Sequence, residues 1–156
     1  MWVAEHGWTY LIAIIDCCTR EIVGWSVDLR CRADEAIAVG ERAVAAYAIE
    51  PGELTLGSDN GSAFTARRFK ASLAELGIAH RRGGYRDPES QAFIESRFGK
   101  LKEREVWLNE YETLDDARRG IGGYVDRYHR RPHSGLNYRT PLEVRGTWED
   151  LQKTAA

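Results

Sequence analysis

Apolar and polar positions in the first third of the chain follow the pattern of a sheet. Residues 8–16 form an aromatic and β-branched run, which predicts a central, buried strand. A short turn follows, and residues 21–27 predict its antiparallel partner, so the two runs should form a hairpin. From residue 34 to about residue 47, Ala, Val and Arg dominate, which is typical of a helix. The chain should therefore begin with a hairpin and a helix.

A second strand signal comes before a cluster of turn residues. The apolar run over residues 54–58 predicts a strand that delivers Asp59 to the carboxyl edge of a sheet, where α/β proteins place their ligands. The alternative is that Asp59 is an Asx-turn residue that caps the next segment. A helix over residues 65–76, a short strand over residues 78–80 and a basic loop over residues 81–87 are expected to follow.

A helix expected from Pro88 to Arg104 organises the second half of the chain. Pro88 suits the first helical turn, with Asp87 as the N-cap. The helical spacing predicts one side facing the core, formed by Ile94, Phe98, Leu101 and Glu105. Glu95 should lie at the edge of this side and be held by packing, and Lys102, two turns later, should project on the same side as Glu95. The alternative is a solvated charged face with helical salt bridges.

The last part of the chain predicts one more long helix. Its pattern covers residues 114–128, although three glycines weaken its middle. Residues 131–144 are expected to be irregular chain packed on the body, with Pro132 and Pro141 as breakers. The order of elements predicts an α/β domain whose mixed sheet is covered by helices on both faces.

Composition narrows the class of protein. A chain of 156 residues with 43% hydrophobic and 29% charged residues fits one globular domain, and no apolar run approaches a membrane span, so no membrane association is expected. The net charge of −2 argues weakly against a dedicated nucleic-acid binder, but Lys and Arg crowd the second half. Three cysteines without C-x-x-C spacing indicate reduced thiols in a cytoplasmic protein. His129 and His133 are four apart, but Pro132 between them disfavours a zinc site.

Four separated motifs resemble the integrase catalytic core of bacterial insertion-sequence (DDE-type) transposases, which are relatives of retroviral integrases in the ribonuclease-H-like superfamily. The motifs are Ser-Asp-Asn-Gly-Ser at 58–62, the 35 residues between Asp59 and Glu95, the stretch 93–103, and the stretch 128–136 with Thr-Pro-Leu-Glu at 140–143. The resemblance implies a ribonuclease-H-like α/β fold with a mixed sheet flanked by helices. It predicts an integrase-like core over residues 1–145, followed by a C-terminal tail over residues 146–156.

The same resemblance implies a catalytic metal site made by two Asp and one Glu. Asp59 and Glu95 match two of these ligands, and carboxylates suit Mg²⁺ or Mn²⁺, of which a complete site holds two ions. The first Asp belongs to a first strand before the segment that matches residues 2–8. That strand is therefore expected to be truncated or missing, and activity to be impaired. Asp16, which also ends a strand, is a less favoured substitute ligand.

The implied function is DNA transposition or integration by metal-dependent phosphoryl transfer, that is, strand cleavage and strand transfer. Lys102, Arg82 and Arg97 are the expected DNA contacts. One alternative is a non-catalytic transposase remnant that acts as a DNA-binding or oligomerisation module, and a less favoured one is a nuclease acting on RNA–DNA hybrids.

The expected partners are DNA and either a second copy of the chain or a full-length transposase. An exposed hairpin edge with an apolar flank that includes Trp8, Leu11 and Trp25 should favour self-association. The expected location is the prokaryotic cytoplasm, where the protein should be associated with the nucleoid when it is bound to DNA.

Overall fold

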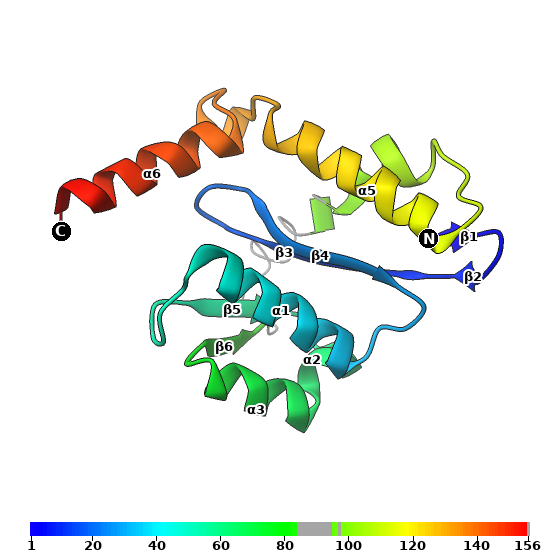
Figure 1. The fold of residues 1–156 in the computed structure, drawn as a ribbon, viewed down its shortest axis with the longest axis horizontal. Coiled ribbons are helices and arrows are strands. Elements are labelled where there is room, and N and C mark those ends of the chain that lie inside the picture. The colour runs from blue at the N-terminus through cyan, green and yellow to red at the C-terminus, as the bar shows by residue number, and fades with distance from the viewer. Residues whose placement is uncertain (84–94, 97, 156) are drawn as a thin grey trace.

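The computed structural model describes residues 1–83, 95–96 and 98–155 (Figure 1). The expected start of the central helix, including Asp87 and Pro88, lies outside these residues, as do Ile94 and Arg97. The chain begins with two short antiparallel strands, β1 (Trp2–Val3) and β2 (Gly7–Trp8).

The predicted hairpin is confirmed by strands β3 (Tyr10–Ile15) and β4 (Ile22–Asp28), which pair antiparallel. The prediction of a buried strand that begins at residue 8 is wrong at its start, because Trp8 is 70% exposed. The physical cause is Thr9, whose amide donates to the Met1 carbonyl oxygen at 2.8 Å and whose hydroxyl donates to the same oxygen at 3.0 Å. These bonds tie residue 9 to the chain start and leave Trp8 outside the β3–β4 ladder.

Two further strands, β5 (Thr55–Ser58) and β6 (Ala79–Arg82), pair parallel to each other. The predicted strand before Asp59 is thus confirmed, and β6 extends two residues beyond its expected end. The described strands form three two-stranded sheets instead of one continuous mixed sheet. Within the described residues, no backbone hydrogen bond joins β3 to β5.

The helices agree with the sequence pattern except at their ends. The predicted helix over residues 65–76 is divided at Ala66, whose ψ of 141° is extended and cannot continue a helix. Residues 95–96 and 98–101 are helical, and the chain then widens into a π-helical turn, η1. The helices that lie wholly within the described residues are α1 (Ala33–Tyr47), α2 (Ser62–Thr65), α3 (Arg67–Glu75), η1 (Lys102–Val106), α5 (Leu114–His129), the 3-10 turn η2 (Ser134–Leu136) and α6 (Pro141–Ala155).

Helix α6 corrects the expectation of irregular chain over residues 131–144. Pro141 does not end regular structure here, because it occupies the first helical position, where its missing N–H is not needed. The Thr140 amide donates to Glu143 Oε2 at 2.7 Å, and the Glu143 amide donates to the Thr140 hydroxyl at 3.2 Å, which together make a capping box. Residue 145, where the core was expected to end, lies inside this helix.

Two apolar cores lie on opposite faces of the hairpin, and Figure 1 shows α5 on one side of β3 and β4 and α1 on the other. Gly24 permits α1 to approach β4, since a Cβ at this position would stand 3.1 Å from Val39 Cγ1. In the part of the chain that the structure describes, no helix is both long and apolar enough to cross a bilayer.

Candidate functional site

Asp59 follows directly after β5 at its carboxyl end, as predicted. Its Oδ1 accepts the Gly61 amide at 2.8 Å, so the residue also forms the Asx-turn that was the alternative interpretation. The neighbouring end of β6 is fastened to this turn, because the Asn60 side chain donates to the Gly83 carbonyl oxygen at 3.0 Å. Asp59 is exposed, and Oδ2 makes no hydrogen bond with the described residues. With respect to the described residues, one carboxylate oxygen is therefore open at the edge of the sheet.

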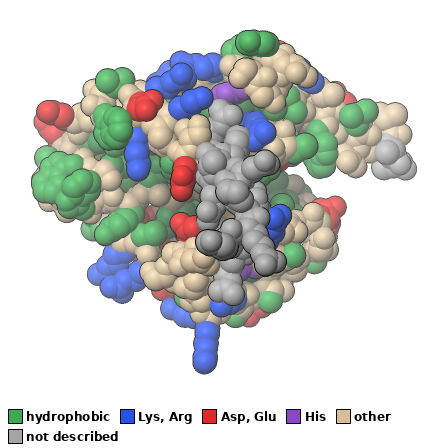
Figure 2. Space-filling model, turned by 180° about the vertical axis from the view of Figure 1, so that it is seen from behind, with side chains coloured by type: hydrophobic (Ala, Val, Ile, Leu, Met, Phe, Trp, Pro, Cys, Tyr) green, Lys and Arg blue, Asp and Glu red, His purple; other side chains and the backbone are tan. Residues whose placement is uncertain are grey.

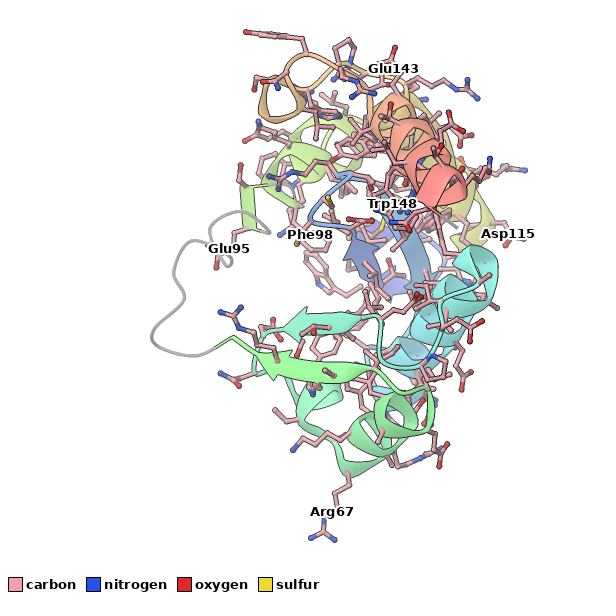
Figure 3. All side chains as sticks on the ribbon, turned by 90° about the vertical axis from the view of Figure 1, so that its left-hand side faces the viewer. Arg67, Glu95, Phe98, Asp115, Glu143 and Trp148 are labelled. Atoms are coloured by element: carbon pink, nitrogen blue, oxygen red, sulfur yellow. The ribbon has the colours of Figure 1, made fainter. Side chains whose placement is uncertain are left out.

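Glu95 is exposed, so the expectation that packing holds its side chain is wrong. The buried side of this helical segment is centred on Leu101, with Phe98 half-buried beside it. Leu101 follows Glu95 by six positions, which places the two side chains about 120° apart around the axis. Figure 3 shows Glu95 on the side of the molecule toward which β5 and β6 run. Its carboxylate thus lies on the same side as the strand ends, but in solvent.

The expected DNA contacts are only partly described. Lys102 is exposed at the start of η1. Burial, and next the charge of Lys102, lower the pKa of the Met1 amino group. Arg82 ends β6 opposite Ser58, next to the turn of Asp59. Arg97 lies outside the described residues.

Asp16 is not an open ligand, because the fold uses both of its oxygens. Oδ1 accepts the amides of Cys18 at 2.7 Å and Thr19 at 3.1 Å. Oδ2 pairs with Arg145 Nη2 at 2.8 Å. The structure gives no support to Asp16 as a substitute metal ligand, since a metal would have to displace an ion pair and a turn.

The donor chemistry of Asp59 and Glu95 fits a hard divalent ion. Mg²⁺ prefers oxygen ligands and keeps several waters while one or two carboxylates bind it. Asp59 Oδ2 and the solvent-facing Glu95 supply oxygens of this kind. No group of three His, Cys, Asp or Glu side chains suited to a metal is found among residues 1–83, 95–96 and 98–155.

Sequence reasoning missed a buried ion network at the hairpin turn. The Arg145 guanidinium is held by Asp16 and by Glu21, whose Oε2 lies 2.5 Å from Arg145 Nε. It also lies over the rings of Tyr47 and Trp148, at 4.9 and 5.4 Å from their centroids. This network docks α6 on the turn between β3 and β4. No local pattern could reveal it, because Arg145 is 129 residues from Asp16.

A second buried acid fixes the end of the helix that carries Glu95. Glu105 is only 5% exposed, and its Oε2 pairs with Arg127 on α5 at 2.7 Å. The Tyr111 hydroxyl donates to Glu105 Oε1 at 3.3 Å, and burial together with the Glu105 charge raises the pKa of Tyr111 to about 12. The helical spacing had placed Glu105 on the core side, but its cationic partner lies on another helix. These contacts set the position of the segment that presents Glu95 and Lys102.

His129 links α5 to the hairpin in its neutral form. Its Nε2 accepts the Ile22 amide at 2.9 Å, and burial lowers the pKa of the imidazole. An unfolded chain takes up this proton near pH 6.5, whereas the folded chain does so only at lower pH. Between these two pH values the unfolded state binds more protons, so the free energy of unfolding should fall as the pH drops below about 6.5.

Urea unfolding at a series of pH values between neutral and mildly acidic checks this expectation. His129→Gln keeps an acceptor oxygen but cannot titrate, so its stability should vary less with pH than that of the wild type over the same interval. Identical pH dependence of the two proteins would contradict the assignment.

Comparisons with known proteins agree with the resemblance seen in the sequence. Residues 1–88 match a family model described as integrase core domain, and residues 76–141 match a second model of the same description. A transposase for insertion sequence element IS904 from Lactococcus lactis is 30% identical over 89% of this chain and 55% of its own length. A putative transposase InsD for insertion element IS2E from Escherichia coli is 27% identical over 83% of this chain and 62% of its own length. The chain thus spans little more than half the length of these relatives.

Among solved structures, the catalytic core domain of BIV integrase is similar, with a TM-score of 0.63 and 21% identity. The match covers 93% of this chain and 90% of the other. This likeness confirms the expected ribonuclease-H-like α/β fold. Since a family model matches more than half of the chain and a second continues it to residue 141, the chain belongs to the integrase core domain family.

Proposed function

We propose that this chain is the catalytic core of an insertion-sequence transposase and that it performs metal-dependent phosphoryl transfer on DNA. The relatives are named transposases, which supports the reaction class. The observation that carries the proposal is the exposed Asp59 at the carboxyl end of β5, with one oxygen open, on the side of the molecule where Figure 3 shows Glu95. Ligand sites of α/β sheets lie at this kind of edge.

In this proposal Asp59 and Glu95 hold Mg²⁺ or Mn²⁺. The bound metal supplies activation of the attacking oxygen and stabilisation of the leaving oxygen. In the same proposal Lys102 and Arg82 neutralise phosphate charge, and the resemblance assigns Arg97 the same role. The residues of the chain thus bind and orient the DNA backbone beside the two carboxylates.

A second candidate is a non-catalytic module that binds DNA or associates with a full-length transposase. The observation in its favour is that Asp59 and Glu95 are joined by no third suitable acid among the described residues, since Asp16, the other strand-end acid, is used within the fold. Two carboxylates bind one ion but do not fix a pair of ions.

The proposal also includes self-association. It further includes a location in the prokaryotic cytoplasm, at the nucleoid when the protein is bound to DNA. Trp8 is exposed and stacks edge-on against the exposed Trp2, with ring centroids 5.8 Å apart. Leu11 and Trp25, which were expected on the same apolar flank, are half-buried against the core under α5. Of the residues expected on this flank, Trp8, together with its neighbour Trp2, is therefore the part open to a second copy.

Asp59→Asn tests the catalytic proposal. The change keeps the shape of the side chain but removes the charge that binds metal, so Mg²⁺- or Mn²⁺-dependent strand transfer on an oligonucleotide should fall by on the order of 100-fold or more. Asp115→Asn is the matched control, because Asp115 is an exposed acid that Figure 3 places on the opposite side of the molecule from Glu95. It should leave the rate unchanged.

The outcomes separate the two candidates. Loss of strand transfer in Asp59→Asn alone supports the catalytic core. A folded wild-type chain that binds DNA without turnover supports the non-catalytic module. Full activity in Asp59→Asn would overturn the proposed site.

A further inference from the structure

A cavity lined by basic and aromatic residues lies on another side of the helix that carries Glu95. Its volume is about 190 Å³, and it lies between this helix, the end of α5 and the chain that follows α5. A water molecule takes about 30 Å³ in the liquid, so the space can hold a phosphate group with some waters. The residues that matter for its chemistry are Lys100, Arg104, Tyr128, Arg131, His133 and Ser134.

Three of these residues are cations that have no acidic partner in the described part of the chain. Lys100, Arg104 and Arg131 are exposed, and none of them takes part in a salt bridge between described residues. Like charges around one cavity repel each other, and an anion inside it would remove that cost. Figure 2 shows Lys and Arg side chains and a histidine gathered at the top of this face, above the grey residues.

The cavity wall is held in place by its own contacts. The His133 imidazole donates from Nε2 to the Tyr128 carbonyl oxygen at 3.2 Å, and its ring centroid lies 4.6 Å from that of Tyr128. The Tyr128 hydroxyl donates to the Arg20 carbonyl oxygen at 2.8 Å. The amide of His133 donates to the Arg139 carbonyl oxygen at 3.0 Å, which closes the loop that carries Ser134. A site already in shape costs little ordering free energy when a ligand enters.

The cavity does not coincide with the proposed catalytic edge. Lys100 comes five residues after Glu95, about 140° further around the helix. Arg104 follows Lys100 by four residues, which keeps it on the same side as Lys100. A DNA backbone bound here would therefore contact a different side of the helix from the one that presents Glu95.

We propose that this cavity binds a phosphodiester group of the DNA backbone, at a contact point separate from the metal site. Arg104 and Arg131 offer the forked donors that match phosphate oxygens, Lys100 adds a point charge, and the Ser134 hydroxyl is a further donor. The inference rests on the proposed function, because it takes DNA as the ligand. The same chemistry would admit free phosphate, and the experiment separates the two.

Fluorescence anisotropy with duplex DNA at several salt concentrations tests the proposal. Arg131→Ala should weaken binding by about tenfold, because a charge-assisted contact is lost. It should also reduce the slope of log affinity against log salt by about 0.9, because one fewer counterion is released. Lys100→Ala should lower the slope in the same way.

Arg67→Ala is the matched control. Arg67 is an exposed arginine on α3 that Figure 3 shows pointing away from the body of the molecule. Its removal should change neither affinity nor slope beyond the error of the measurement. Circular dichroism of each variant confirms that the fold is kept.

Each outcome has one meaning. Weaker binding and a lower slope in the cavity variants, with Arg67→Ala unchanged, support the site. Equal behaviour of the cavity variants and Arg67→Ala overturns it. If inorganic phosphate raises the melting temperature of the wild type but not of Arg131→Ala, while both bind DNA equally, the cavity holds free phosphate and the DNA assignment is wrong. If Asp59→Asn loses strand transfer but the cavity variants bind DNA as the wild type does, the proposed function stands and only this inference is wrong. If the wild type does not bind DNA, both the proposed function and this inference are wrong.

Discussion

Replacing Arg145 with methionine is expected to lower the free energy of unfolding by about 3 to 5 kcal/mol. The side chain is 14% exposed and is the cationic partner of both Asp16 and Glu21. Methionine fills much of the same space but leaves two carboxylates at the hairpin turn without compensation, and Glu21 is buried. A buried charge without a partner costs far more than a lost surface contact. Urea unfolding followed by circular dichroism measures the change.

Two further variants make this result specific. Arg68→Met removes an ion pair of 2.9 Å to Asp34, but its side chain is 76% exposed, so the cost should be below about 1 kcal/mol. Glu21→Gln in the Arg145→Met background removes one of the two carboxylate charges left without a cation and should restore part of the stability. An equal loss in Arg68→Met and Arg145→Met would contradict the assigned role of the network.

Replacing Ile121 with alanine is expected to cost about 2 to 5 kcal/mol. Ile121 is fully buried on the inner side of α5, in the core that also contains Leu101, Val3 and Val27. The truncation removes three methyl or methylene groups and leaves a cavity that this close-packed region can fill only in part. Since Leu101 belongs to the helical segment that carries Glu95, the cavity should also loosen the candidate site.

The control for Ile121 is an apolar residue outside the core. Leu151 on α6 is 65% exposed, so Leu151→Ala should change stability by less than about 0.5 kcal/mol. Ile121→Val should cost about 0.5 to 1.5 kcal/mol, because it deletes only one methyl group. A cost for Ile121→Ala no larger than that for Leu151→Ala would show that α5 does not pack as described.

Elements built from local contacts could be predicted from the sequence. The β3–β4 hairpin and α1 follow the period of their apolar residues, and β5 ends where the turn residues begin. Asp59 was placed correctly because its position depends only on the strand before it. One local signal was overlooked: Thr140 to Glu143 has the spacing of a capping box with proline at the first helical position, and it begins α6.

Features that depend on distant residues could not be predicted. Glu105 occupies a core position, and its cationic partner Arg127 lies 22 residues later on another helix. The exposure of Glu95 depends on where the centre of the buried side falls. A choice among Ile94, Phe98 and Leu101 changes the angle between Glu95 and that centre from about 60° to about 120°. The cavity formed by Lys100, Arg104 and Arg131 joins two segments whose spacing in sequence carries no information about their distance in space.

The Arg145 network also has a consequence for the order of synthesis. Asp16 and Glu21 leave the ribosome long before their cation, because Arg145 is made 129 residues after Asp16. At about 5 to 20 residues per second, this delay is roughly 6 to 26 seconds. Throughout that time the hairpin turn carries two carboxylates that cannot be buried without a partner, so the growing chain must keep this end of the hairpin hydrated. The two carboxylates can be buried only after α6 has been made, so the docking of α6 follows the pairing of the hairpin.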